Sequence, residues 1–369
     1  MIWLTWRQFR AQAITAAVAL AVFAILLIAT ESHLTSLYNS NGLLTCHGDA
    51  CAGLAGNFLN DLSSGGGFLF IPSTSGYAIL YFVSILVILI APAIIGVFWG
   101  APLIASELEA GTFRLTWNQS ITRTRWLAVK LTLIGVAAMA VTEAFSLIQA
   151  WWAAPIGKAV GLGGSSGVFS EGRFGVFVFP THGITPLGYA AFGFALGVTV
   201  GLISRRPISA MAITLAIFAA AQFFTPLWIR PNLLPTSHTT TTMAAAGANV
   251  SVRANPKLTI SASAVPGQSG AWIISSGGVN AAGQPVAIIP AACETAAAQV
   301  LGTHRGTSTL NSGQTALNSC VASQGIRVAE SYQPASHYWP LQWAETGMYL
   351  ALALAMSGYC FWRLNRRRS

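Results

Sequence analysis

Six long apolar runs dominate this sequence, and each is about as long as a helix that crosses a bilayer. A bilayer core of about 30 Å is crossed by about 20 apolar residues in a helix. We place the runs at residues 12–30, 77–99, 127–152, 187–204, 207–228 and 343–362. Charged residues make up only 8% of the 369 residues, against about 25% in an average soluble domain. Lipid must surround much of this chain. We therefore predict an all-α polytopic membrane protein with six transmembrane helices.

Basic residues collect at the ends of these runs and not in one patch, so the net charge of +9 does not indicate nucleic-acid binding. The segment 31–76 contains no Lys or Arg and is predicted to lie outside the membrane. The loop 100–126 is basic and is predicted to lie inside, as is the basic tail 363–369. We expect a multi-pass protein of a bacterial plasma membrane, with both termini in the cytoplasm.

The segment 229–342 between the fifth and sixth runs reads as a small domain outside the membrane. It is rich in Ala, Ser, Thr and Gly, and short stretches alternate apolar and polar residues as half-buried strands do. We predict strands near 250–252, 258–260, 271–274 and 286–289, and helices at 291–300 and 314–323. The fold class expected for this extracytoplasmic domain is α+β.

Four of the five cysteines fall in segments predicted to lie outside, where the compartment is oxidising: Cys46, Cys51, Cys293 and Cys320. Of the three possible connectivities we expect local pairing, 46 with 51 and 293 with 320. The Cys46-His47-x-x-x-Cys51 cluster could instead hold a metal, but it offers only three candidate ligands. We predict no metal site.

Motifs for nucleotide hydrolysis are missing. The sequence contains no G-x-x-x-x-G-K-[ST] loop, and all six histidines fall in segments predicted to lie outside. An intramembrane serine hydrolase would need a base at membrane depth. We therefore predict a chain that is not itself an enzyme and holds no cofactor.

The predicted inside loop carries the densest group of charges in the sequence. Two carboxylates precede a Gly-Thr break, and four cations follow it: Glu107, Glu109, Gly111, Thr112, Arg114, Arg123, Arg125 and Lys130. A charged helix-turn element between two spans suits docking on a soluble partner. The alternative is an ordinary solvated loop whose basic residues anchor the third span.

This loop has the pattern E-x-E-x-G-T, then a polar turn, then R-x-R-W-x-x-x-K, and the chain begins with W-x-x-W-R-Q-F-R at residues 3–10. Together with the run YQPASHYWPLQWAE at 332–345, these motifs resemble the ABC type-2 permease family, especially its actinobacterial members. Many members have a Pro in the turn where this chain has Trp117-Asn118-Gln119.

The resemblance implies the permease half of an exporter, with a coupling helix near 105–111 that contacts a separate ATPase subunit. That partner would bind the ATP and Mg²⁺. The resemblance also implies a dimer with a second permease copy. It further implies an amphipathic interface helix over 1–11, which lies in the headgroup plane of the lipid bilayer and carries Trp3, Trp6, Arg7 and Arg10. The alternative function is a membrane-anchored sensor that acts through its extracytoplasmic domain.

Within the spans, Glu143 is the one acidic residue at mid-membrane depth. We expect it to be protonated or hydrogen-bonded to Thr142, Ser146 or Ser84, with either a packing role or a role in gating. Glu345, near the outer interface, is interpreted as an ordinary charge. The Gly193-x-x-x-Gly197-x-x-x-Gly201 row favours close helix packing within one subunit over a dimer contact.

Overall fold

The structure is a computed structural model, and it describes residues 2–46, 50–64, 76–109, 122–204, 206–252, 258–302 and 307–366. The chain divides into two compact units. Unit 1 comprises Met1–Leu233 and Trp339–Ser369, and unit 2 comprises Leu234–Tyr338. Unit 2 is thus an insertion in the chain that forms unit 1, within the range 229–342 predicted for the extra domain.

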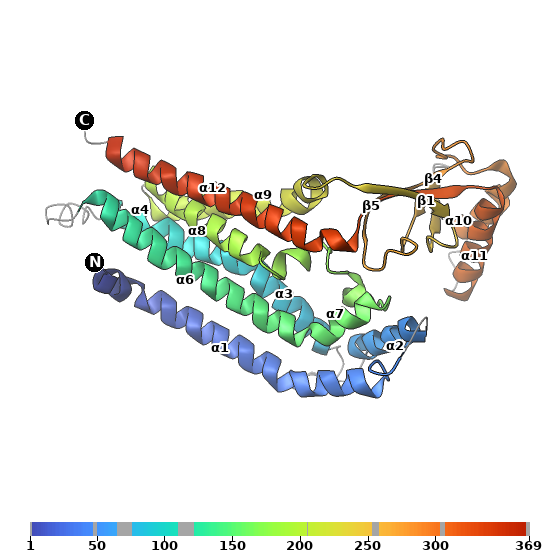
Figure 1. Ribbon diagram of the computed structural model, residues 1–369, viewed down its shortest axis with the longest axis horizontal. Coiled ribbons are helices and arrows are strands. Elements are labelled where there is room, and N and C mark those ends of the chain that lie inside the picture. Colours follow the sequence, from blue (N-terminus) through green and yellow to red (C-terminus); the bar gives the residue numbers. More distant parts are fainter. Residues whose placement is uncertain are drawn as a thin grey trace. The chain divides into compact units, whose positions relative to one another are not determined.

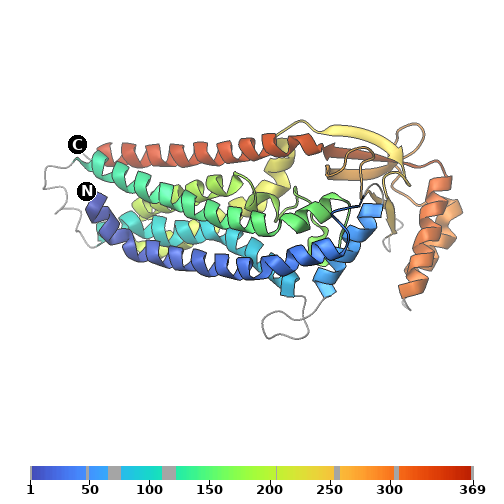
Figure 2. The same ribbon diagram turned by 60° about the horizontal axis from the view of Figure 1, so that its bottom comes forward.

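Unit 1 consists of helices that run side by side (Figures 1 and 2). They are α1 Ile2–Ser40, α2 Ala50–Ser64, α3 Gly76–Ile95, α4 Ala101–Glu109, α6 Arg123–Trp152, α7 Ala154–Gly161, α8 Thr185–Ser204, α9 Pro207–Phe224 and α12 Tyr338–Arg366. Short helical segments join them: η1 Gly96–Gly100 and η4 Thr225–Ile229 are π-helical, and η2 Gly167–Ser170, η3 Phe179–Thr181 and η5 Arg230–Asn232 are 3₁₀ turns. The start of α1 and the end of α12 lie at the same end of unit 1 (Figure 1).

Five helical segments of the described residues are long and apolar enough to cross a membrane: Phe9–Ser40, Gly76–Ser106, Thr124–Trp152, Thr185–Ser204 and Pro207–Asn232. They correspond to the first five predicted runs. The sixth run lies in α12, which has 29 residues but is not apolar enough to meet the same measure, because Glu345, Arg363 and several aromatic residues lower its hydropathy.

The first helix is longer than the apolar run that predicts it. α1 is continuous from Ile2 to Ser40, so residues 2–11 extend the first span without a break, and the helix continues ten residues beyond Thr30. Its last turns pack on α2, where the rings of Tyr38 and Phe58 meet edge to face at 5.4 Å. The segment 31–76, predicted as a loop, thus contains helices. They were not predicted because the segment has no apolar run long enough to cross a membrane.

Helix α8 lies at the centre of unit 1 and is buried along nearly its whole length. Its glycine row (Gly193, Gly197 and Gly201) packs directly on the backbone of α3, η1 and α4. A Cβ added to Gly193 would lie 2.6 Å from the carbonyl oxygen of Pro92, and one added to Gly100 would lie 2.6 Å from that of Phe194. Such approach requires residues without side chains. The glycine row serves packing within one chain, as predicted.

Unit 2 is a mixture of strands and helices around its own core. Its elements are β1 Ser237–Thr242, β2 Asn249–Val252, β3 Leu258–Ser261, β4 Trp272–Val279, β5 Arg327–Gln333, α10 Glu294–Gly302 and α11 Thr307–Ser323. One antiparallel sheet has the order β1-β5-β4, and β2 pairs with β3 in a second. The core includes Val250, Ile260, Leu317, Val321 and Val328.

Several of the predicted elements of unit 2 are present, but not all. The predicted strand at 286–289 is wrong, because these residues form no continuous strand and only isolated bridges occur in this part of the chain. Strands β1 and β5 were not predicted. β1 has the sequence SHTTTT, which carries no apolar alternation, although the structure buries every second residue of it in part.

Candidate functional site

Helix α4 and the start of α6 carry the described residues among those predicted to contact an ATPase. They lie at the end of unit 1 that holds the start of α1 and the end of α12, called here the basic end (Figure 1). Glu107 and Glu109 fall in the last turn of α4, where the Glu109 side chain is exposed. Arg123 is the first residue of α6, and Arg125, in the same first turn, is exposed. Gly111, Thr112 and Arg114 lie outside the described residues. The described structure thus brings α4 and the start of α6 to one end of the bundle.

Lys130 differs from the other cations of this group because only 3% of it is exposed. Its Nζ lies 4.7 Å from the centre of the Trp126 ring, a cation–π contact within α6. Trp126 belongs to a buried cluster with Phe9, Trp99 and residues of α4 and α12. The rings of Phe9 and Trp99 meet edge to face at 4.8 Å. We call this cluster, which includes Phe9, Trp99, Ile104, Trp126 and Leu364, the aromatic hub. It packs the first part of α1, the last part of α12, and helices α4 and α6 together.

Arg7 and Arg10 are exposed, whereas the side chains of Trp3 and Trp6 lie outside the described part of the structure.

Glu143 lies in the middle of α6 and is half-buried. Its Oε2 is buried and has no hydrogen-bond partner among the described residues. The three hydroxyls expected to bind it donate elsewhere: Thr142 to the carbonyl of Ala138, Ser146 to that of Thr181, and Ser84 to that of Tyr81. None of these hydroxyls is hydrogen-bonded to Glu143, because backbone carbonyls within their reach accept their protons instead. The other alternative, a protonated carboxyl group, stays a prediction.

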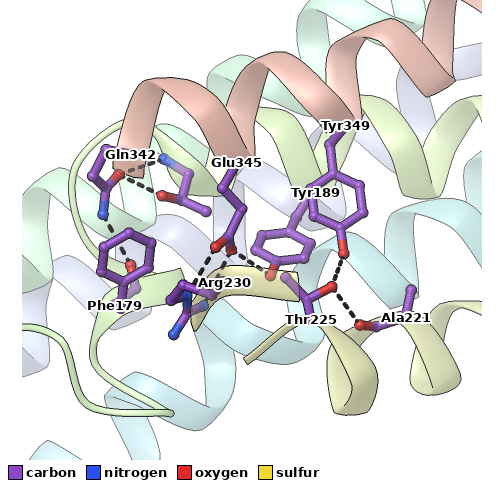
Figure 3. Close-up of polar contacts among 9 residues, drawn as sticks. Phe179, Tyr189, Ala221, Thr225, Arg230, Gln342, Glu345 and Tyr349 are labelled. Atoms are coloured by element: carbon purple, nitrogen blue, oxygen red, sulfur yellow. Dashed lines mark hydrogen bonds and ion pairs between the residues drawn. The ribbon is translucent and has the colours of Figure 1, made fainter. Parts of the chain in front are cut away.

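A buried polar cluster occupies the opposite end of unit 1, and Figure 3 shows its members. Arg230 and Glu345 form an ion pair in which both side chains are fully buried. Arg230 donates from Nε to Glu345 Oε2 at 2.8 Å and from Nη2 to Oε1 at 3.1 Å. This bidentate geometry is the strongest arrangement for an arginine and a carboxylate.

Aromatic side chains and hydroxyls enclose the ion pair. Tyr189 of α8 donates to Glu345 Oε1 at 2.7 Å, and the Arg230 guanidinium lies 4.1 Å from the centre of the Phe179 ring. Tyr349, one turn beyond Glu345, is hydrogen-bonded to Thr225 of the π-helical segment η4 (Figure 3). Both oxygens of Glu345 are thus occupied by donors from this chain, while Arg230 Nη1 is buried without a described partner.

Gln342 extends the cluster to the first turn of α8. Its Oε1 accepts hydrogen bonds from the backbone N–H groups of Ile184 and Thr185 at 3.1 and 3.0 Å. Its Nε2 donates to the carbonyl of Phe179 at 3.2 Å. The first N–H groups of a helix have no partner within it, so α12 supplies the acceptor that α8 lacks.

Sequence reasoning missed this cluster. Glu345 was interpreted as an ordinary interfacial charge, but it is completely buried and paired with a residue 115 positions away. A usable signal was present: Arg230 lies two residues after the fifth apolar run and Glu345 lies near the start of the sixth, so opposite charges come to the same end of these two helices. No local spacing connects them.

The cysteine pairs are within disulfide distance in both predicted combinations. Cys46 pairs with Cys51 at a Cα–Cα distance of 5.4 Å, and Cys293 pairs with Cys320 at 5.8 Å. Cys360 is a buried free thiol. His47 lies outside the described residues, and those residues contain no group of three or more candidate metal ligands.

Comparison with known proteins gives one match. The family model described as ABC-2 membrane transporter related matches residues 17–230, more than half of the chain. The match runs from α1 to Arg230 and stops before unit 2 and α12. Neither the curated proteins nor the solved structures contain a significant match. The chain belongs to the ABC-2 membrane transporter related family.

Proposed function

We propose that this chain is the permease subunit of an ATP-binding-cassette exporter. Membership of a membrane-transporter family is the observation that carries the proposal. A separate ATPase subunit binds ATP and Mg²⁺, and two permease copies form the substrate path between them. α12 is the sixth span: it packs on α8 through Tyr349 and Cys360 and exposes Leu352 and Leu354.

The positions of the cations support an orientation with both termini in the cytoplasm. Six exposed or half-buried arginines of the described residues belong to the basic end: Arg7, Arg10, Arg125, Arg206, Arg363 and Arg366. Short loops rich in Lys and Arg stay on the cytoplasmic side. Both termini and the end of α4 would then face the cytoplasm of a bacterial cell, where the ATPase is.

The aromatic hub supports a coupling role for α4. The exposed Glu109 at its end is available to a soluble partner, while Ile104, three residues after Ala101, is buried in the hub. A displacement of α4 by the ATPase would reach the start of α1 and α6 through closely packed side chains, which transmit strain because interiors have little free volume.

The test is charge reversal in the full-length chain co-expressed with an ABC ATPase subunit, the gene for which we expect beside this one. Glu107→Lys with Glu109→Lys should abolish co-purification or separate ATP turnover from transport. The matched control is Asp61→Lys with Glu294→Lys, which reverses two exposed carboxylates distant from α4 in the sequence. If the α4 variant assembles and couples as the control does, α4 is not the coupling element.

A sensor function is the second candidate, favoured by the compactness of unit 2 and its own buried core. In that case the purified chain would bind a ligand through unit 2 and would not associate with an ATPase. Co-purification of an ATPase whose turnover depends on the permease would exclude this alternative.

A further inference from the structure

The buried ion pair closes the insertion that forms unit 2. Arg230 lies just before Leu234, where unit 2 begins, and Glu345 lies just after Tyr338, where it ends. The two connections of the inserted domain are therefore fastened to each other within unit 1. Since both side chains are fully buried, removing either partner would leave an uncompensated charge in a low-dielectric site.

The same pair is joined to the first half of α8. Glu345 accepts a hydrogen bond from Tyr189, and Gln342, three residues earlier in α12, accepts the first N–H groups of α8. Two successive turns of α8 are thus held by α12 at the point where the insertion is closed.

The second half of α8 packs on the segment that leads to the basic end. A Cβ on Gly197 would lie 2.8 Å from the backbone nitrogen of Ala101, the first residue of α4, and Gly201 faces the carbonyl of the same residue. Backbone rests on backbone here, with no side chain between them that could change its rotamer and absorb a shift. α4 then ends at the exposed Glu109.

We propose that Arg230 and Glu345 are positioning residues that fix α8. A change in this ion pair would then shift α8, and the contacts of its glycine row would pass that shift to α4. The Arg230–Glu345 pair and the end of α4 are then energetically linked, although they lie at opposite ends of unit 1. The consequence for ATP-driven transport depends on the proposed function, whereas the link itself is a property of this chain alone. Rigid elements with direct contacts are a physical basis for such coupling.

Hydrogen exchange of the full-length permease in lipid nanodiscs, without an ATPase, tests the link. The variant Arg230→Met with Glu345→Leu removes both charges and keeps apolar volume, a replacement that buried ion pairs often tolerate. We expect amides of Ala101–Glu109 to exchange about tenfold faster, which corresponds to about 1.4 kcal/mol. The control Lys158→Met with Asp61→Leu removes two exposed charges from other parts of unit 1 and should leave α4 unchanged.

Glu345→Gln provides a second variant, which keeps an acceptor for Tyr189 but leaves Arg230 without a counter-ion, so it should lower the melting temperature. The link is supported by faster exchange in α4 with an unchanged melting temperature in the double variant, and by a larger rise of exchange in α4 than in α1 in Glu345→Gln, since a purely local structural role would not change amides at the far end. Faster exchange confined to η5, α12 and the first turn of α8 would overturn it. Because no ATPase is present, this outcome would leave the transporter proposal intact, and failure of ATPase binding would not affect the exchange result.

Discussion

Each of the two units buries a glutamate, and the two glutamates have opposite surroundings. Glu345 in unit 1 is completely buried, and its two oxygens receive three hydrogen bonds from Arg230 and Tyr189. Glu330 in unit 2 is 2% exposed, and neither of its oxygens has a hydrogen-bond partner among the described residues. It lies on the central strand β5, opposite Thr239 and Ser276.

The difference shows two ways to keep a carboxyl group inside a fold. In unit 1, Glu345 is paired with a guanidinium, which supplies the opposite charge and donates two hydrogen bonds to it. In unit 2, burial raises the pKa of Glu330, since desolvation penalises the ionised form. Glu345 is therefore accommodated by its ion-pair partner, whereas burial of Glu330 favours the protonated form of its carboxyl group. The predictions below test this contrast and what holds each unit together.

Glu345→Ala should have the largest effect. It leaves Arg230 buried without a counter-ion, which costs about 3–5 kcal/mol in the free energy of unfolding. Tryptophan fluorescence during denaturant unfolding in detergent would measure this. Glu109→Ala, at an exposed position, should change stability by less than about 0.5 kcal/mol. Equal stabilities of the two variants would show that Arg230 does not need Glu345 as its counter-ion.

Loss of the Cys293–Cys320 disulfide should weaken unit 2 by about 3–4 kcal/mol, because the bond restricts a long loop of the unfolded chain. The measurement is limited proteolysis of the Cys293→Ser, Cys320→Ser variant, followed at the strands of unit 2. The matched variant Cys46→Ser, Cys51→Ser opens a loop with a sequence separation of only 5 and should cost less. The reverse order would show that loop length does not govern either bond.

Gly197→Ala should destabilise unit 1 by about 1–3 kcal/mol, because the new methyl group meets the backbone of Gly96 and Ala101. Thermal unfolding in detergent would detect it. Gly157→Ala in α7 is the control: its Cβ would meet no atom within 4 Å, and the better helix propensity of Ala should leave stability equal or slightly higher. Similar melting temperatures for the two variants would mean that α8 can move away from η1 and α4 at little cost.

Glu330→Gln should have the smallest effect, and that effect should depend on pH. Because the pKa of Glu330 is raised in the folded unit, the unfolded chain loses this proton first as the pH rises. Stability of unit 2 is then greatest below the usual glutamate pKa and falls as the pH rises to the folded value. Pulse proteolysis from pH 4 to 8 should show this slope in the parent chain and a shallower one in Glu330→Gln. An identical slope in both would assign it to other groups.

Apolar runs were sufficient to place the first five spans, because lipid demands about 20 consecutive apolar residues whatever the tertiary structure. The glycine row was also visible, since its spacing is that of one helix face. Strand β1 was not, because SHTTTT acquires its half-buried pattern only by pairing with β5. The pairing of Arg230 with Glu345 was missed for a related reason: it depends on how α12 and η5 meet, and no local spacing encodes that.

The π-helical segment η1 has a consequence for how this sequence can change. Its five residues, Gly96–Gly100, wind more loosely than an α-helix. Helix α3 ends directly before this segment, and α4 begins directly after it. Single residues gained by a helix are commonly accommodated as such wider turns. Losing one residue there by mutation would let the turn close to an α-helix while α4 keeps nearly the same orientation, because a π-helical turn holds about one residue more than an α-helical turn. A one-residue deletion in α3, which has no such turn, would instead rotate α4 by about 100° and move Ala101 away from the glycine row. A one-codon deletion should therefore be tolerated better in η1 than in α3.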